Sequence, residues 1–369
     1  MTIISLSALR HATVIIMKVL IDARWVRTDY YDGISRYTSS LAEAFSKIQP
    51  VTLIIHDKKQ LNLLPKNVPY IVSNHPFSVK ELFIAKKLNK LGANVVFSPL
   101  QTMGSIGKKY KLILTVQDLI YYKYPKPPTF LPWFVRGAWW LYHQAYWPQR
   151  LVLKSADAVA TVSNTSKKEI LEHNFTKKPV FVVYNAPSNQ LKQIKLTTTK
   201  KDILYMGSFM PYKNVETLIK GMSELPEYTL HLLSKISPRR KKELQSIAPK
   251  NGKIIFHNGV SDEEYSKLLS SASALATAST AEGFGLPIIE AMAKGVPVVC
   301  AETEIFHEVG HDAALYFPAH SAVTFSEQIK KLENEMKRKE VIQNGLSQSK
   351  KFSWQNSAKS LKKHIDGIA

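Results

Sequence analysis

The stretch Ala281–Val299, AEGFGLPIIEAMAKGVPVV, carries the strongest structural signal in this chain of 369 residues. A short apolar run precedes it, and Pro287 stands where a helix tolerates proline, because the first helical N–H has no partner in any case. Gly283 and Gly285 permit positive φ angles and a close approach of the backbone to a ligand. Since the free amides and the dipole of a helix N-terminus attract negative charge, the stretch predicts a strand–turn–helix unit with an anion site at the turn.

Two carboxylates flank this turn. Glu282 lies on the loop, and Glu290 lies near the start of the expected helix, where its carboxylate can accept hydrogen bonds from a pair of neighbouring hydroxyls. A carboxylate beside a phosphate is unfavourable unless hydroxyl-rich parts of the same ligand lie there. The pattern therefore indicates a ligand that carries both phosphates and hydroxyls.

Short apolar runs alternate with helical segments along almost the whole chain, a rhythm typical of α/β proteins with parallel sheets covered on both faces. At roughly 100–200 residues per domain, this length predicts two domains. A polar segment without strong periodicity, Pro187–Lys200, separates two such units. Because ligands of such folds bind at the carboxyl ends of the strands, we expect one held between two Rossmann-like lobes.

The strands predicted for the first unit are Val19–Asp22, Val51–Ile55, Tyr70–Val72, Val95–Ser98, Leu112–Val116, Ala158–Val162 and Val180–Tyr184. Those of the second are Ile203–Met206, Thr229–Leu233, Lys253–His257, Ala274–Thr277 and Pro297–Cys300. Helices are expected over Ser35–Lys47, Asn214–Met222, Pro238–Ser246, Asp262–Ser271 and Pro287–Lys294, and two late helices complete the chain.

Composition excludes several classes of protein. A hydrophobic fraction of 45% and a charged fraction of 21% are those of an ordered globular chain. The single cysteine, Cys300, cannot build a disulfide framework or a thiolate metal cage, and it suits a reducing compartment. Because no apolar run reaches about 18 residues, we expect no transmembrane helix. Residues 1–16 match a signal peptide poorly and are expected to be an N-terminal extension outside the fold.

The charge is strongly positive and uneven. The net charge is +21, from 50 basic and 29 acidic residues. Residues 1–190 carry 25 basic and 10 acidic side chains, a balance of +15, whereas residues 191–369 carry 25 and 19, a balance of +6. This excess predicts an anionic partner for the first half: nucleic acid, an acidic lipid surface or a phosphorylated substrate. A solvated basic surface without a partner explains the same charge.

Glu282 and Glu290, with GFGLP between them and GVPVV after them, resemble the paired-glutamate signature of the retaining family-4 glycosyltransferases. The resemblance covers the chain from Met17 to its end and implies the α/β fold called GT-B, in which two Rossmann-like domains face each other across a cleft. The domains expected are an acceptor-side domain over 17–186, a linker over 187–200, a nucleotide-sugar domain over 201–350 and a C-terminal helix over 351–369 that crosses back to the first domain.

The resemblance also implies a set of donor-binding residues. Lys213 would act as a point charge on the donor's diphosphate, although a lysine taken alone is usually solvent-facing, and Glu290 would hold the ribose hydroxyls. A turn after the strand Lys253–His257 resembles the segment whose backbone reads the nucleotide base. The donor-binding residues implied are Gly33, Gly207, Ser208, Lys213, Gly259, Val260, Phe284, Gly285, Leu286 and Glu290. Within the segment around Gly33, Ser35 is expected to cap a helix.

The catalytic residues implied are Glu282, Lys213, Asp118 and Gln117. Gln117 departs from the family, because it replaces a histidine that usually reaches the transferred sugar. Glutamine can hydrogen-bond a sugar hydroxyl, but it cannot exchange a proton near neutral pH. Since a lysine and backbone amides would stabilise the leaving group, we expect neither a metal ion nor a cofactor, and the nucleotide sugar is a substrate.

His307-Glu308-Val309-Gly310-His311 fits the zinc-protease pattern HExxH. That chemistry needs both histidines on one helical face, a third ligand and the glutamate as a base. Gly310 is better interpreted as a helix terminator. Because Glu308–Gly310 also resembles a landmark of the glycosyltransferase family, we do not expect zinc.

Residues 130–151 hold four of the six tryptophans, mixed with other aromatic and basic side chains. This mixture suits a membrane–water interface, and a large helical packing surface is the alternative. Together with the basic first half, it favours peripheral contact with an anionic bilayer that carries a lipid-linked acceptor. We therefore expect a cytoplasmic protein at the inner face of the cell membrane. The tryptophans are Trp133, Trp139, Trp140 and Trp147.

The expected function is retaining transfer of a hexose from a nucleotide sugar to a hydroxyl of a saccharide or lipid-linked acceptor in cell-surface polysaccharide synthesis. Similarity of Gly33–Tyr37 and Gln117–Leu119 to bacterial polysaccharide mannosyltransferases favours GDP-mannose as donor, with a UDP-sugar as the other choice. The alternatives are a phosphorylase or nucleotide-sugar epimerase of the same fold, and a basic nucleic-acid-binding protein. No recognised nucleic-acid-binding module is present, so we expect no nucleic-acid partner.

Overall fold

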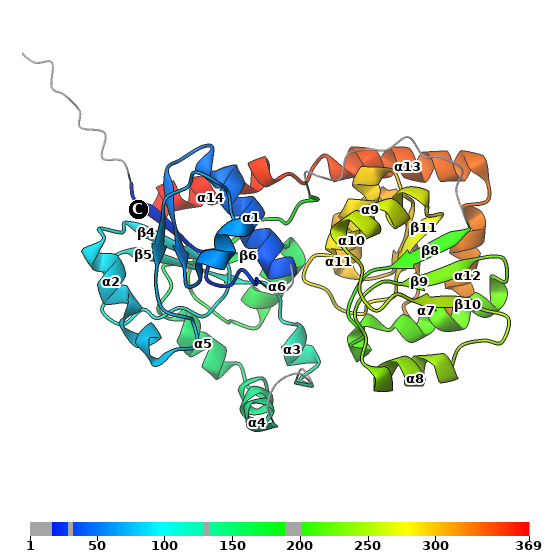
Figure 1. Ribbon diagram of the computed structural model, residues 1–369, viewed down its shortest axis with the longest axis horizontal. Helices are drawn as coiled ribbons and strands as arrows, with labels where there is room; N and C mark the ends of the chain where they lie inside the picture. Colours follow the sequence, from blue (N-terminus) through cyan, green and yellow to red (C-terminus); the bar gives the residue numbers. More distant parts are fainter. Residues whose placement is uncertain (1–16, 29–31, 128–132, 189–200, 369) are drawn as a thin grey trace, which may run out of the picture.

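The computed structural model describes residues 17–28, 32–127, 133–188 and 201–368. These residues form two α/β units that lie side by side, each built on one sheet (Figure 1). The expected N-terminal extension over 1–16 and most of the expected linker lie outside the described residues.

The first unit holds seven parallel strands in the order β3-β2-β1-β4-β5-β6-β7. Every residue of β1, β4 and β6 is buried, because helices cover both faces of the sheet, and these strands are therefore nearly continuous apolar runs. The strands are β1 (Val19–Asp22), β2 (Val51–Ile55), β3 (Tyr70–Val72), β4 (Val95–Ser98), β5 (Lys111–Val116), β6 (Ala158–Thr161) and β7 (Val180–Val182).

The second unit holds six parallel strands in the order β10-β9-β8-β11-β12-β13. The strand order reverses between β8 and β11, and the loops that follow these two strands therefore leave the sheet next to each other, where such sheets bind ligands. The strands are β8 (Asp202–Tyr205), β9 (Thr229–Leu232), β10 (Lys253–Phe256), β11 (Ala274–Thr277), β12 (Val298–Ala301) and β13 (Ala314–Phe317).

Helices connect these strands and cover the sheets (Figure 1). Those of the first unit are α1 (Gly33–Ser46), α2 (Ile84–Lys90), α3 (Ile120–Lys123), α4 (Trp133–Tyr142), α5 (Trp147–Leu153) and α6 (Asn164–Glu172). Those that follow are α7 (Val215–Gly221), α8 (Pro238–Ser246), α9 (Asp262–Ser271), α10 (Leu286–Lys294), α11 (Glu304–Gly310), α12 (Ala322–Lys331), α13 (Glu335–Ser349) and α14 (Trp354–Ile368).

The last helix returns to the first unit. In Figure 1, α13 lies over the second sheet, and α14 continues onto the first, beside α1. Ser357 donates a hydrogen bond to the carbonyl of Tyr184 at 2.7 Å, and Ser360 donates one to the carbonyl of Val182 at 3.0 Å. Trp354 is buried against the ring of Tyr37. The C-terminal segment therefore ties the two units together.

The α/β architecture with two parallel sheets is confirmed, and most predicted strands agree within a residue or two. Three details were wrong. Asp32 caps α1 by accepting a hydrogen bond from the Ser35 N–H at 2.8 Å, whereas Ser35 lies inside the helix. The strand β13, at one edge of the second sheet, was not predicted. Four helices, not two, follow β12.

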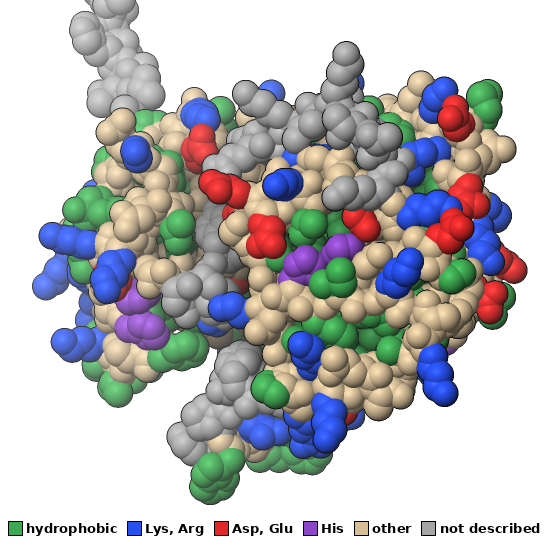
Figure 2. All heavy atoms as spheres, turned by 45° about the vertical axis from the view of Figure 1, so that its right-hand side comes forward, with side chains coloured by type: hydrophobic (Ala, Val, Ile, Leu, Met, Phe, Trp, Pro, Cys, Tyr) green, Lys and Arg blue, Asp and Glu red, His purple; other side chains and the backbone are tan. Residues whose placement is uncertain are grey.

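The surface of α4 and α5 exposes aromatic side chains. Trp133 is 83% exposed, Trp147 is 65% exposed and Trp140 is also exposed. Trp139 instead packs against the rings of Tyr121 and His143, as the alternative of a packing surface expects. Figure 2 shows hydrophobic and basic side chains together at the lower edge of the molecule, where α4 lies in Figure 1. Among the described residues, no helix combines the length and the apolar character needed to cross a bilayer.

Candidate active site

The turn before α10 has the backbone geometry that its sequence predicts. Gly285 has a φ of 96°, a conformation that glycine adopts readily and other residues adopt rarely. A side chain at this position would also begin 3.1 Å from the ring of Phe306. The helix then begins at Leu286, with Pro287 in its first turn. Glycine is therefore required where the backbone amides of the helix N-terminus become available to a ligand.

This turn lies directly against the first unit. A Cβ added at Gly283 would lie 3.1 Å from the Cβ of Asp118 and 3.1 Å from the carbonyl oxygen of Gln117, at the end of β5. The Tyr124 and Thr280 hydroxyls also meet across the boundary, at 2.8 Å. A small cleft of about 90 Å³ opens beside these contacts, and residues of both units line it, including Asp118, Thr280 and Glu282. The site is therefore shared between the two sheets.

Lys213 and Glu282 form an ion pair in this region. Lys213 Nζ donates to Glu282 Oε1 at 2.6 Å, and the side chains are only 14% and 16% exposed. Lys213 comes from the loop after β8 and Glu282 from the loop after β11, which leave the sheet at the point where the strand order reverses. The pair places a cation close to the turn, and the carboxylate of Glu282 balances its charge.

Asp118 has an unusual carboxyl group. Burial raises its pKa from 3.8 to about 6, the hydrogen bond from the Ile120 N–H opposes this effect, and the charge of Glu282 adds to it. Near neutral pH, a measurable fraction of this carboxyl therefore carries a proton. Its neighbour Gln117 donates its side-chain N–H to the carbonyl oxygen of Pro99 at 2.9 Å, which fixes the amide at the end of β5.

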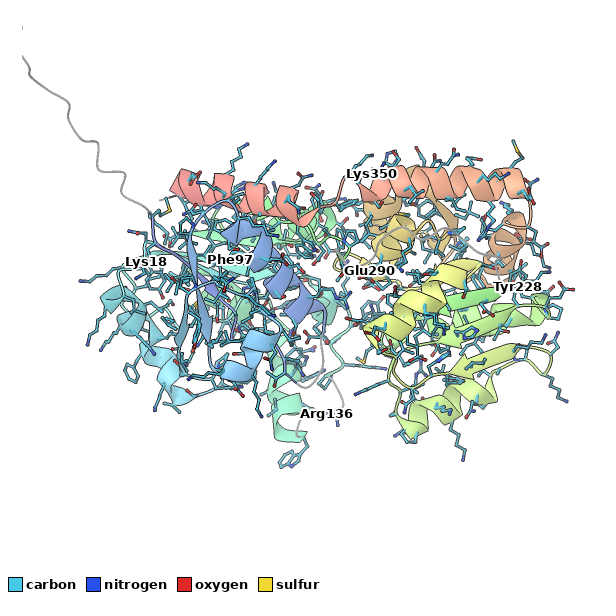
Figure 3. All side chains as sticks on the ribbon, turned by 45° about the horizontal axis from the view of Figure 1, so that its top comes forward. Lys18, Phe97, Arg136, Tyr228, Glu290 and Lys350 are labelled. Atoms are coloured by element: carbon cyan, nitrogen blue, oxygen red, sulfur yellow. The ribbon has the colours of Figure 1, made fainter. Side chains whose placement is uncertain are left out.

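Glu290 is buried at the boundary between the units, as Figure 3 shows, and it is only 3% exposed. Arg36 from α1 donates to the Glu290 carboxylate at 2.6 Å and to Asp262 at 3.1 Å. Burial raises the pKa of Glu290, while the charge of Arg36 and its hydrogen bond to the carboxylate oppose the rise. Sequence reasoning did not include Arg36 in the site, although it stands three residues after Gly33 in a predicted phosphate segment.

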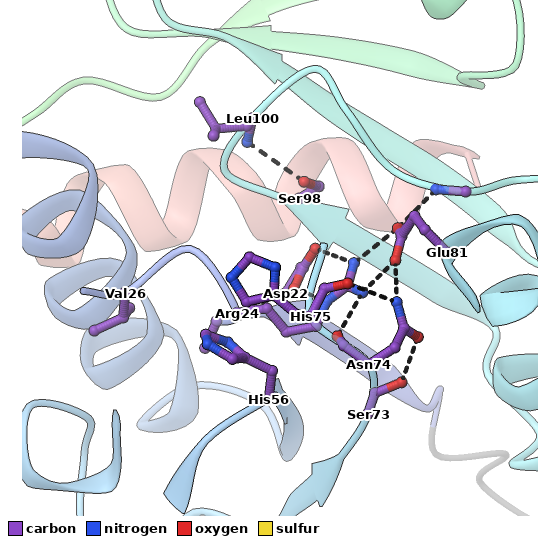
Figure 4. A network of polar contacts seen from close by, with 12 residues as sticks. Asp22, Arg24, Val26, His56, Ser73, Asn74, His75, Glu81, Ser98 and Leu100 are labelled. Atoms are coloured by element: carbon purple, nitrogen blue, oxygen red, sulfur yellow. Dashed lines mark hydrogen bonds and ion pairs between the residues drawn. The ribbon is translucent and has the colours of Figure 1, made fainter. Parts of the chain in front are cut away.

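A buried polar network fixes the loops of the first unit that border the site (Figure 4). Arg24 binds Asp22 at the end of β1 at 2.8 Å and Glu81 at 2.6 Å. Glu81 also accepts hydrogen bonds from Asn74 at 2.6 Å and from the Gly104 N–H at 2.9 Å. These contacts join the segments that follow β1, β3 and β4, so the loops leave the sheet in one fixed arrangement.

Glu308 of α11 closes a second contact between the units. Its carboxylate accepts hydrogen bonds from the backbone N–H groups of Asn164 (2.6 Å) and Thr165 (2.8 Å), which open α6. It also accepts bonds from the Thr165 hydroxyl at 2.7 Å and the Tyr184 hydroxyl at 2.9 Å. A carboxylate at a helix N-terminus interacts favourably with the helix dipole. The Glu308 carboxylate thus forms a contact between the two units.

The two histidines of the HExxH pattern do not share a helical face. α11 ends at Gly310, and His311 lies beyond it with a φ of 45°. His307 approaches Glu302 at 3.7 Å, whereas His311 approaches Asp312 at 3.0 Å. Within the described ranges, no group of three or more histidine, cysteine or acidic residues is arranged to hold a metal ion.

Other predicted donor-site residues lie on the loops of the second sheet. Gly207 donates its N–H to Ser234 Oγ at 3.2 Å, and the carbonyl of Ser208 accepts a hydrogen bond from the Tyr205 hydroxyl. Gly259 has a φ of 106° and donates its N–H to the Leu233 carbonyl at 2.9 Å. These glycines hold the turns after β8 and β10 in place.

The remaining predicted residues differ in how they can meet a ligand. Gly33 is the first residue of α1 and has open space where a side chain would begin. Phe284 has a buried side chain, packed near the rings of Tyr184 and Phe352, so it can offer a ligand only its backbone. Val260 and Leu286 are partly buried against the core.

Comparisons with known proteins agree with this geometry. Residues 31–187 match the family model "Glycosyltransferase Family 4", and residues 188–348 match the model "Glycosyl transferases group 1". The chain belongs to the family-4 glycosyltransferases. The two matches meet at residues 187 and 188, between the last strand of the first sheet and the first strand of the second.

Individual proteins of similar sequence or structure agree with the family matches. The O-antigen chain mannosyltransferase B of Escherichia coli is 30% identical to this glycosyltransferase over 234 residues, which are 55% of this chain and 59% of that protein. An uncharacterized glycosyltransferase of Methanocaldococcus jannaschii is 24% identical over 96% of this chain and 99% of its own. Among solved structures, HepE of Anabaena in complex with UDP-glucose superimposes with a TM-score of 0.72 at 15% identity, covering 95% of this chain and 100% of that one. The GT-B fold is thereby confirmed.

Proposed function

We propose that this glycosyltransferase transfers a hexose from a nucleotide diphosphate sugar to a hydroxyl of a saccharide or lipid-linked acceptor, with retention at the anomeric carbon and without a metal ion. The observation that carries this proposal is the meeting of the α10 turn with the end of β5, where Lys213, Glu282 and Asp118 lie together. Similarity to an O-antigen mannosyltransferase supports mannose as the sugar and cell-surface polysaccharide synthesis as the process.

The donor would bind along the loops of the second sheet. Glu290 accepts hydrogen bonds from the ribose hydroxyls, and the amides at the start of α10 hold the diphosphate together with Lys213. The turn at Gly259 faces the base. GDP-mannose is the first candidate, and the UDP-glucose complex of the structural neighbour HepE makes UDP-sugars the second.

In the transfer step, the bond between the anomeric carbon and the diphosphate oxygen breaks, and its electron pair stays on the diphosphate. Lys213 and the turn amides stabilise this charge in a site that largely excludes water. The acceptor oxygen forms the new bond on the same face of the sugar, and its proton leaves with the diphosphate. Asp118 and Gln117, at the end of β5, would hold the transferred sugar. Because Gln117 carries no exchangeable charge near neutral pH, it orients the sugar without moving a proton.

Exposed tryptophans on α4 and α5 would dock the enzyme on an anionic membrane, where a lipid-linked acceptor lies. Trp133 and Trp147 are largely exposed, and Arg150 and Lys154 on the same segment are exposed cations. Flotation with vesicles containing anionic lipid should recover the wild type and lose the double variant Trp133→Ser/Trp147→Ser. Met336→Ser removes a similarly exposed apolar side chain from α13 and should float as the wild type does. Equal flotation of all three proteins would reject the membrane contact.

Donor binding provides the test of the proposed function. Thermal unfolding should shift upward with GDP-mannose or a UDP-sugar, since a ligand at a hundredfold excess over its Kd stabilises the folded state by about 2.7 kcal/mol. Lys213→Ala and Glu290→Gln should each lose the shift, whereas Lys220→Ala, which removes an exposed lysine from α7, should keep it. A shift that survives both site substitutions would place the donor elsewhere.

A further inference from the structure

Arg36 reaches across the boundary between the units. It starts from α1 in the first unit, yet its guanidinium contacts Glu290 at 2.6 Å and Asp262 at 3.1 Å in the second. Its side chain is 15% exposed, and Glu290 is almost fully buried. A buried carboxylate is costly unless a cation or hydrogen-bond donors satisfy it. Arg36 therefore supplies the cation and the hydrogen bond that the buried Glu290 carboxylate needs.

The proposed donor would need the same carboxylate. If ribose hydroxyls donate to Glu290, they satisfy it in place of the guanidinium, and Arg36 loses this partner. Lys213 is a second cation at the site, and Glu282 already balances its charge. Ser208, another of the implied donor-binding residues, carries no charge. A nucleoside diphosphate, which carries several negative charges, therefore meets a lysine at the α10 turn that is already paired with a carboxylate.

We propose that Arg36 exchanges partners when the donor binds: it pairs with Glu290 in the empty site and with the donor's diphosphate in the occupied site. This inference rests on the proposed function. Only one carbon atom separates the ribose ring from the diphosphate, so rotation of the long Arg36 side chain brings its guanidinium from one to the other. Guanidinium matches phosphate oxygens in a bidentate geometry and stays protonated throughout, so Arg36 donates hydrogen bonds and moves no proton.

The exchange has a consequence for catalysis. The charge that develops on the leaving diphosphate is then stabilised by one cation from each unit, Lys213 from the second and Arg36 from the first. Cleavage of the donor therefore requires the two units to be closed on each other, which excludes water and limits hydrolysis.

The experiment compares nucleosides with nucleoside diphosphates. Calorimetric titration gives the Kd of guanosine, GDP, uridine and UDP for the wild type, Arg36→Gln, Arg36→Lys and Arg239→Gln. Arg239→Gln is the control, because it removes an arginine that is almost fully exposed on α8. The informative quantity is the ratio of the nucleoside Kd to the diphosphate Kd for the preferred base. Arg36→Gln should lower this ratio by roughly 10- to 100-fold, as expected for the loss of a charged hydrogen bond to phosphate.

The same substitution should leave nucleoside binding unchanged or tighter, since the ribose no longer competes with Arg36 for Glu290. Arg36→Lys should restore part of the ratio, and Arg239→Gln should keep all of it. An unchanged ratio in Arg36→Gln overturns the exchange of partners and leaves the proposed function standing. Equal weakening of nucleoside and diphosphate binding also overturns it, because Arg36 would then only maintain the shape of the pocket. A wild type that binds none of the four probes overturns the proposed function together with this inference.

Discussion

Replacement of Asp118 by asparagine should stabilise the protein above neutral pH. A rise in the carboxyl pKa from 3.8 in the unfolded chain to about 6 in the folded one means that the folded state binds the proton more tightly. Stability contributed by this group is therefore present at low pH and is lost as the pH rises through about 6. The rise corresponds to about 3 kcal/mol, an upper limit because the side chain is partly exposed. The amide oxygen of the asparagine would still accept the hydrogen bond from the Ile120 N–H, without the buried charge.

Thermal or urea unfolding of wild type and Asp118→Asn between pH 4 and pH 8 measures the effect. The variant should be more stable at pH 8 by up to about 3 kcal/mol, and the difference should shrink toward pH 4. Asp157→Asn is the control of opposite sign. Although burial opposes it, hydrogen bonds from Lys108 and the Leu112 N–H lower the pKa of Asp157, so this variant should be less stable at pH 8 and approach the wild type as the pH falls. An Asp118→Asn variant that is destabilised at pH 8 would refute the reasoning, because the ionised carboxylate would then be a favourable contact.

Two further substitutions test the contacts between and within the units. Glu308→Ala leaves the first two N–H groups of α6 without their acceptor. In urea titrations it should lower the free energy of unfolding by about 2–3 kcal/mol. A change within error would mean that water replaces the carboxylate at no cost in free energy. Gly285→Ala forces a side chain into a left-handed conformation and against Phe306, so it should lower the melting temperature and abolish the donor-induced shift. Gly137→Ala is the control, because α4 has open space at that position. Alanine there should be neutral or should stabilise the protein by roughly 0.5–1 kcal/mol. Equal destabilisation by both substitutions would mean that the positive φ of Gly285 is not the cause.

The local structure of this protein could largely be predicted from its sequence. Strands such as β1 and β11 are buried on both faces and are short apolar runs bounded by polar residues, and their alternation with helical segments indicates strands. The α10 turn could be predicted because Gly285 permits the positive φ that the turn needs and Pro287 has the fixed φ of a first helical turn. β13 escaped prediction although it is as long as β1 and β11; it lies at an edge of the second sheet, and two of its four residues are only partly buried.

Contacts between distant parts of the chain could not be predicted in the same way. Glu290 was identified by its spacing from Glu282, but its partner Arg36 lies 254 positions away, and no local pattern connects the two. Glu308 stood within an apparent metal motif, and only the packing of α11 against α6 shows that it binds the helix N-terminus. These side chains are placed by the docking of the two units, which depends on the whole fold.

The central claim is that a nucleoside diphosphate lies at the start of α10, between Lys213 and Glu290. A crystal structure of the protein with GDP or UDP tests it most directly. Phosphate oxygens should lie within hydrogen-bond distance of the Leu286 N–H and Lys213 Nζ, and ribose hydroxyls should lie on the Glu290 carboxylate. A nucleotide bound at another place, or one whose ribose leaves Glu290 paired with Arg36, would contradict it.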